Sequence, residues 1–275
     1  MPRPTVILHH GLLGYDVLQV GPFRHAYWRG IDRAITDDGY PLIVTRAAPT
    51  GGVARRAREL KESMLTQLDR LGDRGRRVIL VGHSMGGLDA RYAVARLGLA
   101  DRVAAVVTVC TPNRGSPVAD FVVQHLNDRI AVLRLLGKLG LEVGAATDLT
   151  TRNCEAMNLA APDAAGVAYF SVGATRPWYQ MPPWAMATCK LIEAAEGAND
   201  GLVSVASSHW GTDLGVWRAD HWHSINRRVR PEFGPDPTGP IAPYWVRMLR
   251  AVEARLADAR SASVPVGGEA TSRAF

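Results

Sequence analysis

The chain has 275 residues, of which 47% are hydrophobic and 21% are charged, enough apolar sequence for one sizeable buried core. Its formal net charge of +6 does not indicate a nucleic-acid-binding protein, because the basic residues alternate with acidic ones in segments of helical pattern such as 55–59 and 253–255. No stretch approaches the roughly 18 to 20 apolar residues of a membrane-spanning helix, so stable membrane insertion is not expected.

The N-terminus and the cysteines bear on the cellular compartment. Residues 1–4 lead directly into an apolar run, without the charged region, long apolar region and small-residue cleavage site of a signal peptide. Cys110, Cys154 and Cys189 are odd in number and lack metal-ligand spacing, as expected for reduced thiols. The sequence therefore predicts a cytoplasmic protein, although a chain whose leader had been removed would look the same.

Short apolar runs alternate with segments of helical periodicity over the first 110 residues. The expected strands are 6–8, 42–44, 78–81 and 103–109, and the expected helices are 26–37, 53–71 and 86–97. This alternation predicts an α/β protein with βαβ units around a mostly parallel sheet. Functional groups of such sheets lie at the carboxyl ends of the strands, so we expect the chemistry in the loops after His9, Val81 and Val109.

The second half of the chain follows a different pattern. Amphipathic helical runs in the segment 118–162 indicate an insertion over the sheet. Later elements are a strand at 167–173, a Trp- and Pro-rich stretch at 176–184 and a helix at 241–259. We expect a single domain over 1–260, with the insertion at about 118–162, and a tail at 261–275 whose composition is typical of mobile termini.

Residues 82–86 read Gly-His-Ser-Met-Gly and fit the pattern G-x-S-x-G. A predicted strand precedes the pattern and a predicted helix follows it, the context in which the serine occupies a sharp strand-to-helix turn. Small residues are needed two positions before and after the serine, because strand and helix pack closely there. Ser84 is therefore the expected nucleophile, and a plain glycine turn is the alternative.

A serine hydroxyl requires a histidine that accepts its proton. In enzymes with this type of turn, the acid and then the histidine follow the serine in the sequence. His221 lies in a late loop before a short segment of helical pattern, which favours it as the base. His125 lies in the insertion, ahead of any suitable acid, and His209 and His223 are alternatives, with His223 the main competitor.

The third member of such a site is a carboxylate that orients the histidine. Asp200 lies in an Asn-Asp-Gly turn beside an apolar run, which suits a carboxylate presented from a loop at the sheet edge. Asp213 and Asp220 are the alternatives, and the side chain of Asp220, adjacent to His221 in sequence, would usually point elsewhere. We therefore select Asp200.

The oxyanion of a tetrahedral intermediate requires two backbone N–H donors. One comes from the residue after the nucleophile, which is Met85. The other is expected from the glycine-containing loop at 9–14, where Leu12 is the selected donor. The histidine pair in this loop is not expected to bind a metal, because no carboxylate or cysteine lies at ligand spacing.

Several separated blocks resemble the bacterial true lipases, the triacylglycerol lipases of Pseudomonas, Burkholderia and Proteus within the α/β-hydrolase superfamily. These blocks are 10–14, 82–92, 111–116, 199–204 and 220–226. The resemblance implies the α/β-hydrolase fold, a mostly parallel sheet flanked by helices with a helical lid insertion. It also places the catalytic triad on Ser84, Asp200 and His221 and the oxyanion donors on Leu12 and Met85.

The same family binds a structural calcium ion beside the catalytic histidine. Its ligands are an aspartate two residues after the histidine, a glutamine four residues further on, an upstream aspartate and backbone carbonyls. Here these two positions hold His223 and Arg227, neither of which offers the oxygen ligand that a hard cation requires. We therefore expect no calcium site and no cofactor, and we expect Arg227 to pair with a nearby carboxylate.

The resemblance further implies that the segment 118–162 is a lid over the acyl-binding cleft, although an amphipathic segment that caps the core would show the same pattern. Candidates for lining the acyl pocket are Trp178, Tyr179, Met181, Trp184 and Trp222. Core packing explains these residues equally well.

These observations predict a serine carboxylic ester hydrolase, a lipase or esterase that acts through an acyl-enzyme. Its expected partner is a small-molecule or lipid ester, with transient contact with a lipid interface and no nucleic acid. An acyltransferase or a polyester hydrolase would use the same triad. A hydrolase-fold binding protein would keep the site without using it.

Overall fold

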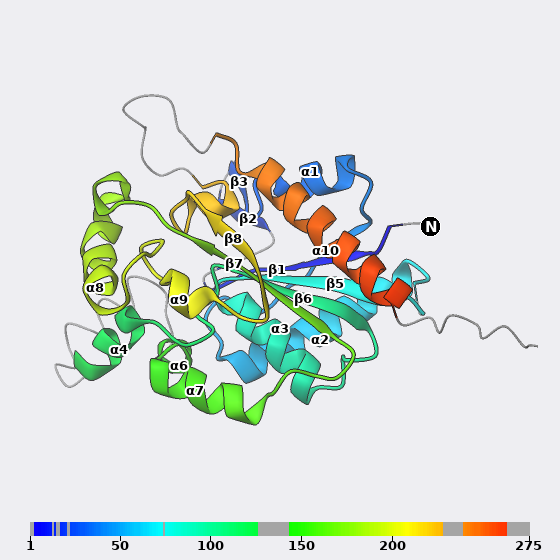
Figure 1. The fold of residues 1–275 in the computed structure, drawn as a ribbon, viewed down its shortest axis with the longest axis horizontal. Coiled ribbons are helices and arrows are strands. Elements are labelled where there is room, and N and C mark those ends of the chain that lie inside the picture. The colour runs from blue at the N-terminus through cyan, green and yellow to red at the C-terminus, as the bar shows by residue number, and fades with distance from the viewer. Residues whose placement is uncertain are drawn as a thin grey trace, which may run out of the picture.

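A computed structural model describes residues 3–12, 14, 17–20, 23–73, 75–125, 143–227 and 239–262. Six strands form a central sheet in the order β4-β1-β5-β6-β7-β8, and each neighbouring pair is parallel (Figure 1). The strands are β1 (Val6–His9), β4 (Leu42–Val44), β5 (Val78–His83), β6 (Val103–Val109), β7 (Ala168–Ala174) and β8 (Thr212–Trp217). The predicted α/β architecture with a parallel sheet is confirmed.

Helices cover both faces of this sheet, because successive residues of the central strands are apolar and point to opposite sides. In β5, Ile79 and Val81 belong to one buried cluster and Val78 and Leu80 to the other. The first cluster is closed by α1 (Ile31–Asp37) and α10 (Ala242–Ala262), and the second by α2 (Val53–Arg70) and α3 (Met85–Arg96). Figure 1 shows these two helix pairs on opposite sides of the strands.

The remaining described helices are α4 (Pro117–Gln124), α6 (Val143–Asp148), α7 (Thr151–Ala160), α8 (Met186–Glu196) and α9 (Val205–Ser208). In Figure 1, α4, α6, α8 and α9 gather beyond the left-hand end of the sheet, toward which β1 runs from the N-terminus. Helices α4, α6 and α7 come from the predicted insertion at 118–162, and they contact one another. Residues 126–142, which include one of the predicted helical runs, lie outside the described part of the chain.

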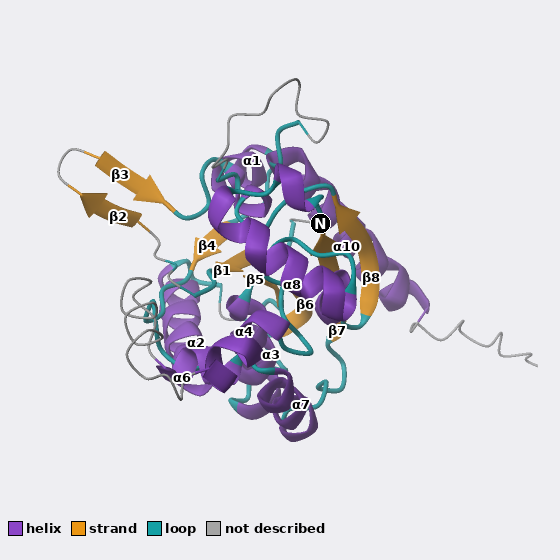
Figure 2. Ribbon diagram, turned by 90° about the vertical axis from the view of Figure 1, so that its left-hand side faces the viewer, coloured by secondary structure: helices purple, strands orange, loops and turns teal. Residues whose placement is uncertain are grey.

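The observed fold differs from the prediction near the N-terminus. The predicted helix at 26–37 begins only at Ile31, because Phe23–Ala26 forms strand β3, which pairs with β2 (Val17–Val20) in an antiparallel hairpin. Gly30, with φ of +81°, stands at the start of the helix in a left-handed conformation that glycine adopts readily. Figure 2 shows the hairpin projecting from the body of the protein.

The ends of the chain and its cysteines bear on the remaining expectations. Helix α10 extends to Ala262, two residues beyond the predicted end of the domain, and residues 263–275 lie outside the described part. The three cysteines are free thiols and all are buried. Among the helices that the structure describes, none combines the length and apolarity needed to cross a lipid bilayer.

Candidate active site

Ser84 lies on a sharp turn between β5 and α3. Its φ of +56° and ψ of −134° lie outside the usual region for a residue with a side chain, so the surrounding packing must hold the turn in place. The N–H of Ser84 donates to the carbonyl oxygen of Val109 at the end of β6, 2.9 Å away. A Cβ added at Gly82 would lie 2.3 Å from the carbonyl oxygen of Gly86, which explains why only glycine fits there.

The structure brings Ser84, His221 and Asp200 together. His221 Nε2 lies 3.0 Å from Ser84 Oγ, and His221 Nδ1 lies 2.7 Å from Asp200 Oδ2. The other oxygen of Asp200 accepts the N–H groups of Leu202 and Val203 at 2.9 and 2.8 Å. Because the carboxylate accepts Nδ1–H, Nε2 of the neutral imidazole is left as the proton acceptor that faces the serine.

The competing residues do not join this arrangement. His209 is exposed, and His125 is an exposed residue at the end of α4 whose ring packs on that of Phe121. Asp213 lies on the edge strand β8, where its carboxylate accepts the N–H of Gly215. Asp220 and His223 lie on either side of His221 in the sequence and are buried, but both of their side chains bond to Arg176.

The loop after β1 lies directly against the nucleophile turn. A Cβ added at Gly11 would lie 2.7 Å from Ser84 Cβ, so the loop backbone approaches the serine as closely as glycine permits. A Cβ at Gly86 would lie 2.7 Å from the carbonyl oxygen of His10. Leu12 packs against the cluster that contains Met85. The two residues selected as oxyanion donors therefore lie on adjoining backbone segments beside Ser84.

A buried arginine, which was not among the residues selected from the sequence, supports this loop. Arg56 Nη2 donates to the carbonyl oxygens of His10 and Gly11 at 2.6 and 3.3 Å, and its Nε donates to Asp89 Oδ2 at 2.8 Å. Both charged side chains are fully buried. Burial raises the pKa of Asp89 to about 6, although the neighbouring guanidinium of Arg56 acts in the opposite direction. The position of Arg56, three residues after the buried Val53 on the apolar face of α2, is a signal that could have identified it.

A chain of hydrogen bonds runs from this loop to the loop that carries His221. The N–H of Gly11 can only donate, so it gives its proton to Tyr27 Oη at 3.1 Å, and the Tyr27 hydroxyl then donates to His83 Nδ1 at 2.7 Å. His83 is therefore protonated on Nε2, which donates to Ser224 Oγ at 2.8 Å. The Ser224 hydroxyl donates to the carbonyl oxygen of His221 at 2.6 Å. Burial holds the pKa of His83 well below its usual value, which favours this neutral form. Neither Tyr27 nor Ser224 was selected from the sequence.

The residues at the positions of the family's calcium ligands do not fit a hard cation. Nδ1 of His223 accepts a hydrogen bond from the guanidinium of Arg176 at 2.9 Å. Arg227 lies over the ring of Tyr27, with 5.5 Å between its guanidinium carbon and the ring centre. A cation does pair with a carboxylate in the loop of His221, where Arg176 Nη1 lies 3.3 Å from Asp220 Oδ2.

Several of the aromatic candidates lie on the surface. Trp178, Tyr179 and Trp184 are 39, 57 and 56% exposed, whereas Met181 is completely buried. The ring of Trp184 packs edge-on against Trp222 with centroids 6.0 Å apart. Trp222 in turn packs against His221 with centroids 5.9 Å apart. Core packing therefore explains Met181, and an aromatic path leads from the exposed Trp184 to the histidine.

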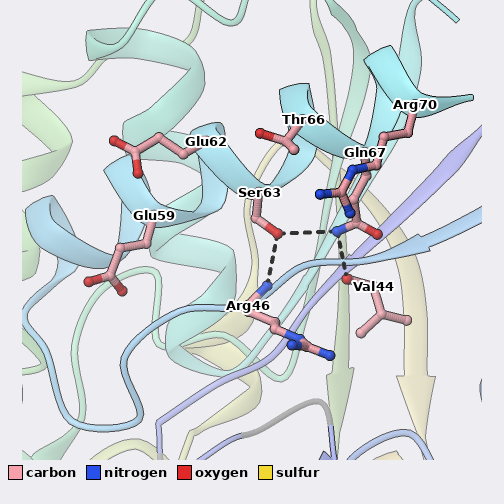
Figure 3. Close-up of a pocket in the computed structure, with 8 residues that line it drawn as sticks. All are labelled: Val44, Arg46, Glu59, Glu62, Ser63, Thr66, Gln67 and Arg70. Atoms are coloured by element: carbon pink, nitrogen blue, oxygen red, sulfur yellow. Dashed lines mark hydrogen bonds between the residues drawn. The ribbon is translucent and has the colours of Figure 1, made fainter. Parts of the chain in front are cut away.

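A separate surface groove between β4 and α2 contains none of the triad residues. Figure 3 shows that the Ser63 and Gln67 side chains in this groove bond to each other and to nearby backbone. Ser63 Oγ accepts the N–H of Arg46 at 3.2 Å, and Gln67 Nε2 donates both to Ser63 Oγ and to the carbonyl oxygen of Val44. The groove shows no arrangement of reactive groups.

Comparisons with known proteins agree with this geometry. The family model described as alpha/beta hydrolase fold matches residues 4–163. Triacylglycerol lipase 2 of Saccharomyces cerevisiae is 32% identical over 209 residues, which cover 73% of this chain and 62% of the yeast protein. The chain thus spans less than two thirds of that relative's length. Triacylglycerol lipase of Vibrio cholerae is 27% identical over 82% of this chain and 80% of its own length.

Solved structures show the same fold. The mature lipase of Bacillus licheniformis superposes with a TM-score of 0.69 at 21% identity, over 90% of this chain and 92% of that one. The lipase of Staphylococcus hyicus gives a TM-score of 0.71 at 16% identity, over 94% of this chain and 97% of that one. The protein therefore belongs to the α/β-hydrolase family and is related to the triacylglycerol lipases within it.

Proposed function

We propose that the protein is a serine carboxylic ester hydrolase of the lipase type. The observation that carries this proposal is the continuous hydrogen-bonded line from Asp200 through His221 to Ser84. A line of this kind activates a serine hydroxyl, because the histidine accepts the proton as the oxygen attacks and the carboxylate stabilises the imidazolium that forms.

The reaction has two halves. Ser84 Oγ attacks the ester carbonyl, His221 Nε2 takes the hydroxyl proton and delivers it to the leaving alcohol, and the acyl group remains on the serine. Water then attacks the acyl-enzyme, with His221 again transferring the proton, and the carboxylic acid leaves. The N–H groups of Leu12 and Met85 hold the oxyanion in both halves, since their backbone segments adjoin beside Ser84.

The substrate that we propose is a lipid ester. The curated relatives are named triacylglycerol lipases, and exposed aromatic side chains extend from the surface to Trp222 beside His221. Aromatic rings that are exposed in water suit transient contact with acyl chains at a lipid interface. The insertion that contains α4, α6 and α7 is the proposed lid. A cytoplasmic location is retained as a proposal, because the three buried thiols suit a reducing compartment.

A chain-length series tests the proposal. Initial rates are measured for p-nitrophenyl esters from acetyl to palmitoyl, in solution and with an emulsified interface. We expect hydrolysis of medium and long acyl chains, with higher rates at the interface. Confinement of activity to the acetyl ester would contradict the lipid substrate but not ester hydrolysis itself.

The role of Ser84 is tested in the same assay. Ser84→Ala should lower kcat by about 10⁶-fold, because the variant lacks the nucleophile. Ser63→Ala, which removes a hydroxyl from the groove between β4 and α2, is the matched control and should leave kcat unchanged. Comparable rates for Ser84→Ala and the unaltered protein would contradict the proposed function.

A further inference from the structure

The loop that carries His221 is held by Arg176, which lies two residues after the end of strand β7. Nη1 of Arg176 lies 3.3 Å from Asp220 Oδ2, and Nη2 lies 2.9 Å from His223 Nδ1. One guanidinium therefore contacts residues on both sides of His221. The arginine and aspartate side chains are 9 and 6% exposed, so water screens their attraction only weakly.

The partner of this guanidinium shapes the turn after His221. Asp220 Oδ1 accepts the N–H groups of Trp222 and His223 at 3.0 and 2.9 Å, which fixes the start of the 3₁₀ helix His223–Ile225. A buried carboxylate in this role needs a cation nearby, because an unpaired charge inside a protein is strongly destabilising. Arg176 supplies that cation.

The backbone of Arg176 also reaches the loop of the catalytic acid. Its N–H donates to the carbonyl oxygen of Asn199 at 3.2 Å, one residue before Asp200. The N–H of His221 donates to the carbonyl oxygen of Asp200 at 2.9 Å. Arg176 thus joins the two loops whose relative position sets the bond between His221 and Asp200.

We propose that Arg176 is a positioning residue whose guanidinium takes the place of the structural calcium ion found in the lipases that the chain resembles. The inference rests on the proposed ester hydrolase function, since the loop that it holds carries the proposed base. Both oxygens of Asp220 are engaged by N–H donors, and His223 Nδ1 accepts from the guanidinium. Calcium is bound by about six to eight oxygen ligands. The two positions after His221 that supply ligands in that family here hold the nitrogen-bearing side chains of His223 and Arg227.

A metal titration tests the proposal without relying on activity. The purified protein is treated with EDTA and dialysed. Its Tm is then recorded with and without CaCl₂ at about 5 mM, a large excess over the protein. We expect the same Tm in all samples and the same rate of p-nitrophenyl butyrate hydrolysis. A Tm or kcat that falls on chelation and is restored by CaCl₂ would overturn the proposal.

Substitution of the arginine tests its positioning role. Arg176→Met should lower kcat by about 10- to 100-fold with little change in KM, because a displaced histidine slows the chemical step more than substrate binding. Arg176→Lys should show an intermediate kcat, since an ammonium can pair with Asp220 but lacks the planar fork that also reaches His223. Arg250→Met on the remote helix α10 is the control and should leave kcat unchanged. It removes the ion pair between Arg250 and Asp38, which follows α1.

The outcomes separate this inference from the proposed function. If Arg176→Met keeps the kcat of the unaltered protein, the positioning role is wrong even though ester hydrolysis stands. If the unaltered protein hydrolyses no ester, the proposed function fails, and the calcium titration still decides whether the metal has been replaced. If Arg176→Met does not fold, Arg176→Lys carries the test, and a kcat for it equal to that of the unaltered protein contradicts the role.

Discussion

Asp200 has two sets of partners that serve different purposes. Its Oδ2 accepts from His221, whereas its Oδ1 accepts from the backbone of Leu202 and Val203. The backbone bonds fix the carboxylate in its own turn, so its position does not depend on the histidine. The charge of the carboxylate, by contrast, stabilises the imidazolium that forms when His221 carries the proton of the serine.

The charge of Asp200 can be tested separately from its position. Asp200→Asn should lower kcat by about 10⁴-fold, because the amide favours the wrong tautomer of His221 and cannot stabilise the imidazolium. KM and Tm should change little. Asp213→Asn, on the edge strand β8, is the matched control. Retention of full kcat by Asp200→Asn would contradict its assignment as the acid.

Individual residues differed in how well the sequence predicted their place. Ser84, Asp200 and His221 stand in turns whose local composition is distinctive, and the structure brings them together. Tyr27 and Arg176 have no local signature, because their partners lie 56 and 44 residues away in the chain. A contact of that kind depends on the completed fold, which a pattern of neighbouring residues does not report.

At the scale of elements, three loops meet at the carboxyl edge of the sheet and are joined by one chain of hydrogen bonds. The chain passes from Gly11 through Tyr27, His83 and Ser224 to the carbonyl oxygen of His221. Each donor in it has one acceptor, so the protons point in a single direction. The loop after β1 and the loop of His221 are therefore positioned together.

Removal of one hydroxyl breaks this chain in the middle. Tyr27→Phe leaves the buried N–H of Gly11 and Nδ1 of His83 without their partner, which should cost about 1 to 3 kcal/mol of unfolding free energy. Loss of loop position should also reduce kcat by about tenfold or more. Urea unfolding and ester kinetics measure the two effects, with Tyr244→Phe on α10 as the control. Unchanged kcat in Tyr27→Phe would show that the chain does not position the site.

The elements themselves were predictable where a strand is buried on both faces. Strands β1, β5 and β6 are continuous apolar runs, and their bounds match the prediction to within two residues. Strand β8 was not predicted, because Thr212–Trp217 lies at the sheet edge, is largely exposed and contains Asp213 and Gly215. An edge strand lacks the buried pattern that marks the central ones.

At the scale of the whole molecule, three buried histidines couple stability to pH. Burial holds the pKa values of His9 and His83 well below the usual value and lowers that of His10 to about 3. The unfolded chain binds protons at these side chains below about pH 6.5, whereas the folded chain does not. Their contribution to stability is therefore complete above about pH 6.5 and is lost as the pH falls towards their folded pKa values. Asp89, whose pKa burial raises to about 6, acts in the opposite direction as it binds its proton in the folded state.

We therefore expect a lower free energy of unfolding at acidic pH. Each histidine contributes a slope of up to about 1.4 kcal/mol per pH unit. We expect the carboxyl groups whose pKa values burial raises, those of Asp89, Asp148 and Asp220, to offset this loss only in part. Urea unfolding at neutral pH and at about pH 5, more than one unit below the usual histidine pKa, measures the difference in unfolding free energy. His10→Gln should reduce the difference and the exposed His125→Gln should not. Equal stability at the two pH values would contradict this account of the buried histidines.

The activation of Ser84 by His221 is measured most directly with a fluorophosphonate. The serine oxygen attacks phosphorus, fluoride leaves, and a stable adduct forms only where the serine is activated. We expect one adduct, located by mass spectrometry on the peptide that contains Ser84, and its loss in His221→Ala. An adduct on another serine, no adduct at all, or equal labelling of His221→Ala would contradict the assignment of Ser84, His221 and Asp200 as a catalytic triad.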